Sequence, residues 1–238
     1  MHTESPDLPG IAVVFGSSGG IGSALVAALS RNPRYIAVLG YSRSGPLTFD
    51  LTDEASIAAA ATRIAQSGHP LRTVIDATGA LTAEGCIAEK SWRQLDPETM
   101  ARAFQINTIG PALIAKHALP KLRKNDKAIF AALSARVGSI SDNRLGGWHA
   151  YRASKSALNM LVKTCSVELA WSHKMAVCVT LHPGTVDTPL SQPFQANVPE
   201  AKLFTTDRSA AALLAVLDQL DASQTGGLFA WDGEQIPF

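Results

Sequence analysis

The chain has 238 residues, of which 46% are hydrophobic and 17% charged, and its 21 basic and 20 acidic side chains leave a formal net charge of +1. This composition excludes a disordered or collagen-like chain, and the length suits one large α/β domain. A near-zero charge argues against nucleic acid or an anionic membrane surface as the partner, because both require clustered lysine and arginine. We therefore expect a small-molecule ligand.

Neither a membrane span nor an export signal is expected. No apolar run approaches the roughly 18 to 20 residues that cross a bilayer. Residues 1–10 contain Glu4, Asp7 and prolines in place of a basic and then apolar leader. These features predict a cytoplasmic protein.

The cysteines and histidines show no metal or redox pattern. Cys86, Cys165 and Cys178 form no CxxC pair, and their flanking residues are typical of a buried helix and strand. The histidines lack the HxxxH or carboxylate-flanked spacing of a zinc site. We predict structural cysteines and no bound metal.

Short β-rich apolar runs alternate with longer amphipathic segments along the chain. Because the periodicity switches repeatedly between strand and helix, we predict one α/β domain over residues 1–238, a doubly wound parallel sheet with helices on both faces. Residues 187–207, which contain three prolines, are the least regular stretch and are expected to form a substrate lid. Strands are expected at 11–15, 36–39, 74–75, 128–133 and 176–181, and helices at 24–29, 57–64, 98–122 and 151–171.

The first predicted strand runs directly into a glycine-rich turn, GSSGGIG at 16–22, and then into a helix. Glycines permit positive φ angles and let backbone N–H groups approach a phosphate, and the helix N-terminus adds partial positive charge. This context predicts a dinucleotide site, although the spacing differs from GxGxxG and a tight turn alone is the alternative. The expected contacts are Gly16, Ser17, Ser18, Gly20, Ile21 and Gly22.

The second strand ends in LGYSR at 39–43, without a carboxylate. An acidic residue at this place holds the ribose 2′-OH of NAD, whereas a basic residue accepts the 2′-phosphate of NADP. Ser42 and Arg43 can bind a phosphate through charge-assisted hydrogen bonds. We predict NADP(H) in preference to NAD(H), the alternative being that Arg43 is a solvated loop residue.

A tyrosine and a lysine four residues apart, Tyr151 and Lys155, stand at the start of a predicted helix. They share a helix face, so the hydroxyl and the ammonium can converge on one pocket. The cation is expected to stabilise the phenolate and to lower the pKa of Tyr151 from about 10. The pair therefore predicts a proton donor, and an aromatic ring over a surface lysine is the alternative.

Asn107 lies within the predicted helix 98–122, four residues before Pro111. Because proline has no N–H group, the carbonyl of Asn107 loses its helical partner and is available to a water molecule. A kinked core helix with an incidental asparagine is the alternative.

Together these features resemble the short-chain dehydrogenase/reductase family over essentially the whole chain. The glycine turn resembles that family's cofactor motif, Tyr151 and Lys155 its catalytic pair, and PGTVDT at 183–188 its PGxVxT segment. The resemblance implies a Rossmann-type fold and an NADP(H)-dependent carbonyl reductase or alcohol dehydrogenase. The segments RVGSI at 136–140, GGW at 146–148, YRASKSALN at 151–159 and WDGEQIP at 231–237 are similar to sniffer and C-factor type carbonyl reductases within the family.

The resemblance also implies individual roles. Tyr151 gives or takes the proton, Lys155 tunes it and holds the nicotinamide ribose, and Asn107 positions a water that links it to Lys155. A homodimer or homotetramer that pairs through helices 98–122 and 151–171 is implied as well. The implied cofactor contacts are Asp50 and Leu51 at the adenine, Ala77 and Gly79 at the adjoining ribose, Val186 and Thr188 at the nicotinamide carboxamide, and Thr78, Pro183 and Gly184 in the same segments.

Two departures from the family pattern bear on the mechanism. The family's serine stands three residues before a glycine, where this chain has Ala135. The neighbouring Ser134 is our predicted donor to the substrate carbonyl, with Ser139 as the alternative, and a shift by one strand position requires local irregularity because it turns the side chain to the other face. The second departure is DATG at 76–79 in place of NNAG, where Asp76 is expected to buttress the strand-end turn.

Two other functions stay open on the sequence. The displaced serine and the altered NNAG segment favour a non-catalytic dinucleotide-binding regulator or signalling protein. A lyase or epimerase is the third possibility, because fold does not fix function. The substrate is not specified, but Leu190, Phe194, Val198 and Leu203 in the expected lid predict a partly apolar pocket.

Overall fold

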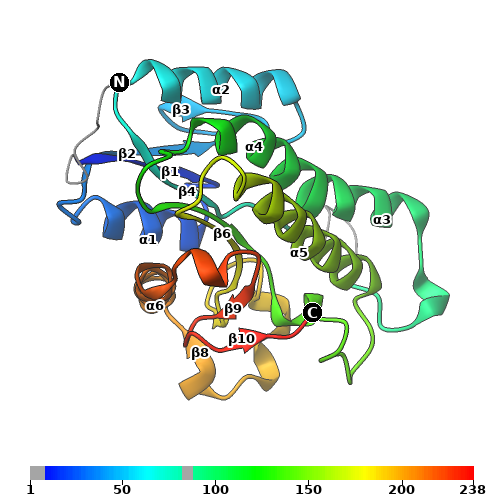
Figure 1. The fold of residues 1–238 in the computed structure, drawn as a ribbon. Coiled ribbons are helices and arrows are strands. Elements are labelled where there is room, and N and C mark those ends of the chain that lie inside the picture. Colours follow the sequence, from blue (N-terminus) through cyan, green and yellow to red (C-terminus); the bar gives the residue numbers. More distant parts are fainter. Residues whose placement is uncertain (1–8, 82–87) are drawn as a thin grey trace.

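The computed structural model describes residues 9–81 and 88–238, so Cys86 lies outside the described residues. These residues form an eight-stranded sheet in the order β10-β9-β6-β5-β4-β1-β2-β3, with a separate pair of short strands, β7 and β8 (Figure 1). All neighbours in the large sheet pair in parallel except β9 and β10. The strands are β1 Gly10–Phe15, β2 Tyr35–Ser42, β3 Leu47–Thr48, β4 Leu71–Asp76, β5 Ala128–Leu133, β6 Ala176–His182, β7 Thr185–Val186, β8 Leu203–Phe204, β9 Leu228–Ala230 and β10 Gln235–Ile236.

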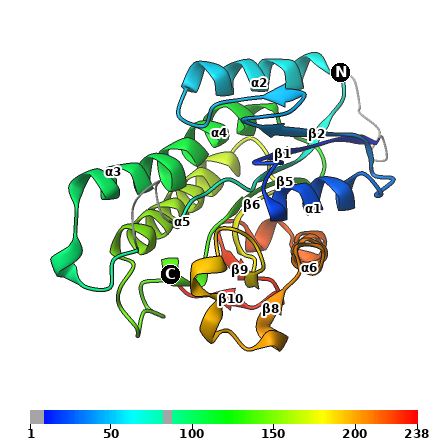
Figure 2. The same cartoon turned by 180° about the vertical axis from the view of Figure 1, so that it is seen from behind.

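Helices cover both faces of the sheet, which confirms the predicted doubly wound fold (Figure 2). Helices α1 and α6 pack on one face of the sheet, and α2, α4 and α5 pack on the other. The helices are α1 Gly20–Leu29, α2 Glu54–Gln66, α3 Pro97–Phe104, α4 Gly110–Ala118, α5 His149–Leu169 and α6 Thr206–Gln219. Across residues 9–81 and 88–238, no helix has the length and apolarity needed to span a membrane.

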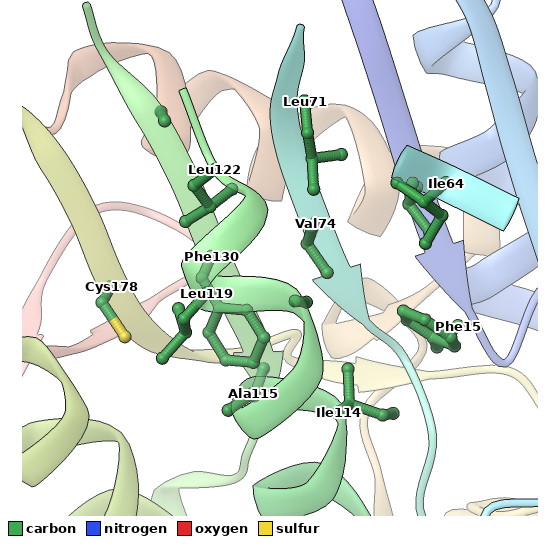
Figure 3. Close-up of a cluster of buried hydrophobic side chains, with 14 of the residues drawn as sticks. Phe15, Ile64, Leu71, Val74, Ile114, Ala115, Leu119, Leu122, Phe130 and Cys178 are labelled. Atoms are coloured by element: carbon green, nitrogen blue, oxygen red, sulfur yellow. The ribbon is translucent and has the colours of Figure 1, made fainter. Parts of the chain in front are cut away.

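Alternation along the strands produces two apolar cores, one on each face of the sheet. Successive side chains of β1 point to opposite faces, so Val13 and Phe15 join one core and Val14 joins the other. Figure 3 shows the first core, in which Phe15 and Phe130 from the strands lie with side chains from the helices. Because both faces are covered, functional groups collect at the strand ends, where the chain leaves the sheet.

The predicted helix 98–122 is divided where Asn107 and Pro111 stand. Residues Gln105–Ile109 form a π turn between α3 and α4, in which the N–H of Gly110 donates to the carbonyl of Gln105 five residues earlier. Pro111, which has no N–H group, follows at the start of α4. The helix is therefore divided by a π turn at Asn107, just before the proline.

The expected lid at 187–207 is irregular but ordered by short elements. It contains 3-10 turns at Gln192–Asn197 and Glu200–Lys202, and its end forms β8 beside β7. A hydrogen bond from the N–H of Asp187 to the carbonyl of Phe204 closes the loop at its base. Other 3-10 turns lie at Trp92–Gln94, Leu119–Lys121, Arg136–Gly138 and Ala222–Gln224.

Candidate active site

A cavity of about 300 Å³ lies at the carboxyl ends of the parallel strands. This is the edge where ligands bind in open α/β sheets, beside the point where the strand order reverses, here between β1 and β4. The cavity therefore gathers residues from the ends of three strands, β4, β5 and β6, and from α5. Its lining includes Ile21, Ala77, Thr78, Gly79, Ser134, Ala135, Arg136, Trp148, Tyr151, Lys155, His182, Pro183, Gly184, Val186, Thr188, Leu190, Phe194 and Val198.

The glycine turn is built to hold an anion beside this cavity. Gly16 has a φ of +82°, and a Cβ on Gly22 would collide with the carbonyl of Gly16, so the turn admits no side chain at either position. The helix α1 has neither a side-chain cap nor an acidic residue in its first turn. Its first N–H groups and their partial positive charge are therefore available to a phosphate. Gly20 lies against Thr188 of the cavity wall, which joins the turn to the cavity.

The two expected phosphate ligands at the end of β2 differ: Ser42 is engaged in a hydrogen bond, and Arg43 is exposed to solvent. Ser42 is buried and its hydroxyl donates to the carbonyl of Ser44 at 2.6 Å. Arg43 is exposed. Asp50 accepts hydrogen bonds from the N–H and hydroxyl of Thr52, at 2.8 and 2.7 Å. A phosphate bound at this strand end can therefore reach the exposed side chain of Arg43.

Tyr151 and Lys155 share one face of α5 and are nearly enclosed, with 8% and 3% of their surface exposed. The Lys155 Nζ donates to the carbonyl of Leu133 at 2.8 Å and lies 5.9 Å from the centre of the Tyr151 ring. Our expectation of a lowered tyrosine pKa is wrong, because burial raises the pKa of Tyr151 to about 12. Tyr151 therefore keeps its proton at neutral pH and is a donor.

Asp76, which stands where the family pattern has asparagine, interacts with Lys155 as a buried charge. Burial lowers the pKa of Lys155 to about 8, and the Asp76 carboxylate opposes that shift. Burial likewise raises the pKa of Asp76 to about 6, opposed by its hydrogen bonds with Thr78 and by Lys155. Asp76 accepts from the N–H of Thr78 at 2.9 Å and from its hydroxyl at 2.6 Å, so it buttresses the strand-end turn as predicted.

Replacing Asp76 with asparagine is expected to lower the pKa of Lys155 further below about 8, because the carboxylate that favours the charged ammonium is removed. The amide oxygen can still accept both hydrogen bonds from Thr78. NMR titration of the Lys155 side chain measures this shift.

Asp221→Asn is the matched control for that measurement. Asp221 makes the same turn, accepting from the N–H of Ser223 at 2.8 Å and from its hydroxyl at 2.6 Å, but it is fully exposed. This control should leave the pKa of Lys155 unchanged. An unchanged or raised pKa in Asp76→Asn would show that the two charges do not interact.

Asn107 is fully buried, and its side chain does not line the cavity. Its Oδ1 accepts from the N–H of Ala80 at 2.9 Å, and its Nδ2 donates to the Ala80 carbonyl at 2.8 Å and to Ser154 Oγ at 3.2 Å. The side chain therefore fixes the segment after β4 against α5. The predicted water relay from Asn107 to Lys155 stays a prediction.

The two serines considered as carbonyl donors both direct their protons elsewhere. Ser134 Oγ donates to Oδ1 of Asn159 on α5 at 2.7 Å, so its proton is engaged within the protein. Ser139 Oγ donates to the carbonyl of Pro237 near the chain end. Ala135 lines the cavity at the place of the family's serine. The geometry therefore does not support either serine as the donor.

The sequence predicted some of the apolar residues that line the cavity but not Trp148. Trp148 adopts a left-handed backbone with φ of 51°, and its ring centre lies 4.7 Å from that of Phe194 and 6.4 Å from that of Tyr151. The two glycines before it also have positive φ, which is the sequence signal for this turn. Leu190, Phe194 and Val198 line the cavity as expected, whereas Leu203 instead pairs in β8 and does not line it.

Two proteins with established names are similar to this chain in sequence. The chain is 37% identical to C-signal of Myxococcus xanthus over 144 residues, which is 60% of this chain and 81% of that protein. It is 32% identical over 185 residues to 1-hydroxy-2-glutathionyl-2-methyl-3-butene dehydrogenase of Rhodococcus sp. (strain AD45), covering 77% of this chain and 76% of that one.

Solved structures of similar fold include two carbonyl reductases. The carbonyl reductase Sniffer of D. melanogaster superposes with a TM-score of 0.83 at 22% identity, over 97% of this chain and 100% of that chain. An NADPH-bound carbonyl reductase from chicken fatty liver superposes with a TM-score of 0.80 at 26% identity, over 97% of this chain and 99% of that chain. The sequence pattern of the short chain dehydrogenase family matches residues 10–199. Since that match spans most of the chain, the protein belongs to the short-chain dehydrogenase/reductase family and is an oxidoreductase by that membership.

Proposed function

We propose that the protein is an NADP(H)-dependent carbonyl reductase or alcohol dehydrogenase. The observation that carries this proposal is the buried pair of Tyr151 and Lys155 in the wall of a cavity that adjoins an uncapped, glycine-lined helix N-terminus. The chicken and fly structures, both of carbonyl reductases, support the reaction class. The cofactor named for the chicken protein supports NADPH.

The residues at the strand ends fit a dinucleotide. The turn at Gly16–Gly22 would hold the pyrophosphate, Arg43 the 2′-phosphate and Lys155 the nicotinamide ribose. Ala77, Gly79 and Thr188 would line the remainder of the site. When bound, the nicotinamide supplies a hydride to a carbonyl carbon or takes one from an alcohol.

The chain itself handles the proton at the substrate oxygen. In the reducing direction the carbonyl carbon gains a hydride and the oxygen gains the hydroxyl proton of Tyr151, so the product is an alcohol and Tyr151 is left as a phenolate. Lys155 Nζ, 5.9 Å from the Tyr151 ring centre, stabilises that negative charge. Trp148 and Phe194 pack together in the lining of the cavity and favour a substrate with an apolar group next to its carbonyl.

Titration with NADPH and NADH, followed by a panel of aldehydes, ketones and quinones with the preferred cofactor, tests the proposal. We expect tighter binding of NADPH and oxidation of its nicotinamide by some of the carbonyls. Tight binding without turnover of any carbonyl would instead indicate the regulator, which the occupied serines favour, and a product with no net redox change would indicate a lyase or epimerase.

Arg43→Ala is expected to weaken NADPH binding about 10- to 100-fold, the equivalent of one charge-assisted hydrogen bond, while NADH binding changes little. Fluorescence titration with each nucleotide measures both affinities. Arg31→Ala, which removes another exposed arginine near the end of α1, is the control. Equal loss for both nucleotides would contradict recognition of the 2′-phosphate by Arg43.

The quaternary structure remains part of this proposal. Exposed apolar side chains follow the two long helical segments, among them Met160, Val167 and Trp171 on and after α5 and Ile109 before α4. Such a stripe suits self-association through these helices. Light scattering after size-exclusion chromatography should give a dimer or tetramer.

A further inference from the structure

Where β5 ends, the wall of the cavity has no hydroxyl group available to donate a hydrogen bond. A carbonyl substrate can accept such a bond at its oxygen. A carbonyl oxygen has two lone pairs, of which Tyr151 takes one. Ser134 donates to Asn159, and Ala135 has no donor in its side chain. Any second donor to the substrate oxygen must therefore come from another element. The inference that follows rests on the proposed carbonyl chemistry.

His182, the last residue of β6, lies beside this gap. The N–H of Ser134 donates to the carbonyl of Leu181 at 2.7 Å, which sets the end of β5 next to His182. On the other side, Lys155 donates to Leu133 at the same end of β5. His182 and Lys155 therefore both lie at this end of β5, and His182 and Tyr151 both line the cavity.

The environment of the imidazole determines which nitrogen carries the proton. Nδ1 of His182 is buried and has no hydrogen-bond partner within residues 9–81 and 88–238. His182 lines the cavity and its Nδ1 is enclosed, so of the two ring nitrogens we infer that Nε2 is the one available to a ligand in the cavity. A buried N–H without a partner is rarer and more costly than an unused lone pair, so the favoured tautomer has the proton on Nε2.

The imidazole is also neutral at physiological pH. Burial lowers the pKa of His182 to about 4, the charge of Arg136 lowers it further, and Asp232 opposes both. A neutral ring with a proton on Nε2 is a hydrogen-bond donor that does not compete with Tyr151 as an acid. Arg136, which also lines the cavity, is held in ion pairs with Asp142 and Glu234.

We propose that the Nε2–H group of His182 donates the second hydrogen bond to the substrate carbonyl oxygen, opposite the Tyr151 hydroxyl. Its role is to polarise the carbonyl and to stabilise the negative charge that develops on oxygen as the hydride reaches carbon. No proton leaves His182, since Tyr151 supplies the one that the product alcohol requires. His182 thus stands in for the hydroxyl that Ala135 lacks.

Four variants test this assignment. His182→Leu should lower kcat by about 10²- to 10³-fold, the range for loss of one donor to a developing oxyanion, with NADPH affinity unchanged. His182→Gln, whose amide can present an N–H near the position of Nε2, should retain most of the activity. Adding Ala135→Ser to His182→Leu should recover activity, because a hydroxyl then replaces the lost donor. His69→Leu, which alters an exposed histidine outside the cavity lining, is the control.

The outcomes separate this inference from the proposed function. Absence of turnover by the unaltered protein would contradict the carbonyl chemistry itself. Turnover that is unaffected by His182→Leu, or equally low in the leucine and glutamine variants with no recovery from Ala135→Ser, would overturn the role of His182. NMR of the imidazole nitrogens gives a test that needs no activity: we expect the Nε2–H tautomer, and an Nδ1–H tautomer would overturn the assignment.

Discussion

Tyr151→Phe is expected to lower kcat for carbonyl reduction by about 10²- to 10⁴-fold, the usual contribution of a positioned general acid. The hydroxyl proton is the one that the product alcohol needs, and a pKa of about 12 keeps that proton on Tyr151 throughout the neutral range. Phenylalanine retains the ring beside Trp148, so the shape of the cavity is preserved. Steady-state kinetics with NADPH and a responsive carbonyl measure the loss.

Tyr35→Phe is the matched control, because it removes the same atom from a tyrosine whose hydroxyl contacts Thr73 at 2.8 Å and lies outside the cavity lining. NADPH affinity should be nearly unchanged in both variants. Equal kcat values for the two variants would show that the proton comes from a group other than Tyr151, and the proposed mechanism would be wrong.

Lys155 adds a pH dependence to the same step. Its pKa is lowered to about 8 by burial, so the ammonium is charged below that pH and loses its charge as the pH rises through it. The phenolate that Tyr151 leaves behind then loses its nearest cation. Reduction should therefore decline above about pH 8, well before Tyr151 itself ionises near 12.

The parts of the site that were predictable from sequence are those encoded over short distances. The glycine turn follows its strand directly, and Tyr151 and Lys155 are one helical turn apart, so the sequence places the pair on one helix face, and its occurrence together with the glycine turn identified it. Asp76 was expected to buttress the strand-end turn, and it does so through a partner only two residues away, Thr78. For the same reason the doubly wound fold followed from the alternation of strand and helix periods.

The features that escaped prediction depend on packing between distant segments. The raised pKa of Tyr151 comes from burial, which no local motif reports. His182 acquires meaning only because the register of β5 and β6 sets it beside Ser134, and because Asn159 on α5 accepts the Ser134 proton. The contact of the Asn107 amide with Ala80 likewise joins segments that are distant in sequence, and no local motif predicts it.

Gly22→Ala is expected to destabilise the fold and the cofactor site together. The new Cβ would overlap the carbonyl oxygen of Gly16, a backbone atom that cannot move without shifting α1 away from the end of β1. Overpacking of this kind costs about 1–3 kcal/mol in the free energy of unfolding. For a domain of this size, each kcal/mol corresponds to a fall in Tm of roughly 2–4 °C. Thermal unfolding and NADPH titration measure the two effects.

Gly19→Ala provides the control within the same turn. Gly19 has an ordinary φ of −74°, and a Cβ there would meet the Gly16 oxygen at 3.4 Å, which is normal van der Waals contact. This variant should lose less stability than Gly22→Ala and keep more of its NADPH affinity. If both variants lost the same amount, the general flexibility of glycine, and not the close approach of α1 to Gly16, would explain why the turn needs glycine at position 22. Retention of full NADPH affinity in Gly22→Ala would show that the first turn of α1 does not hold the pyrophosphate.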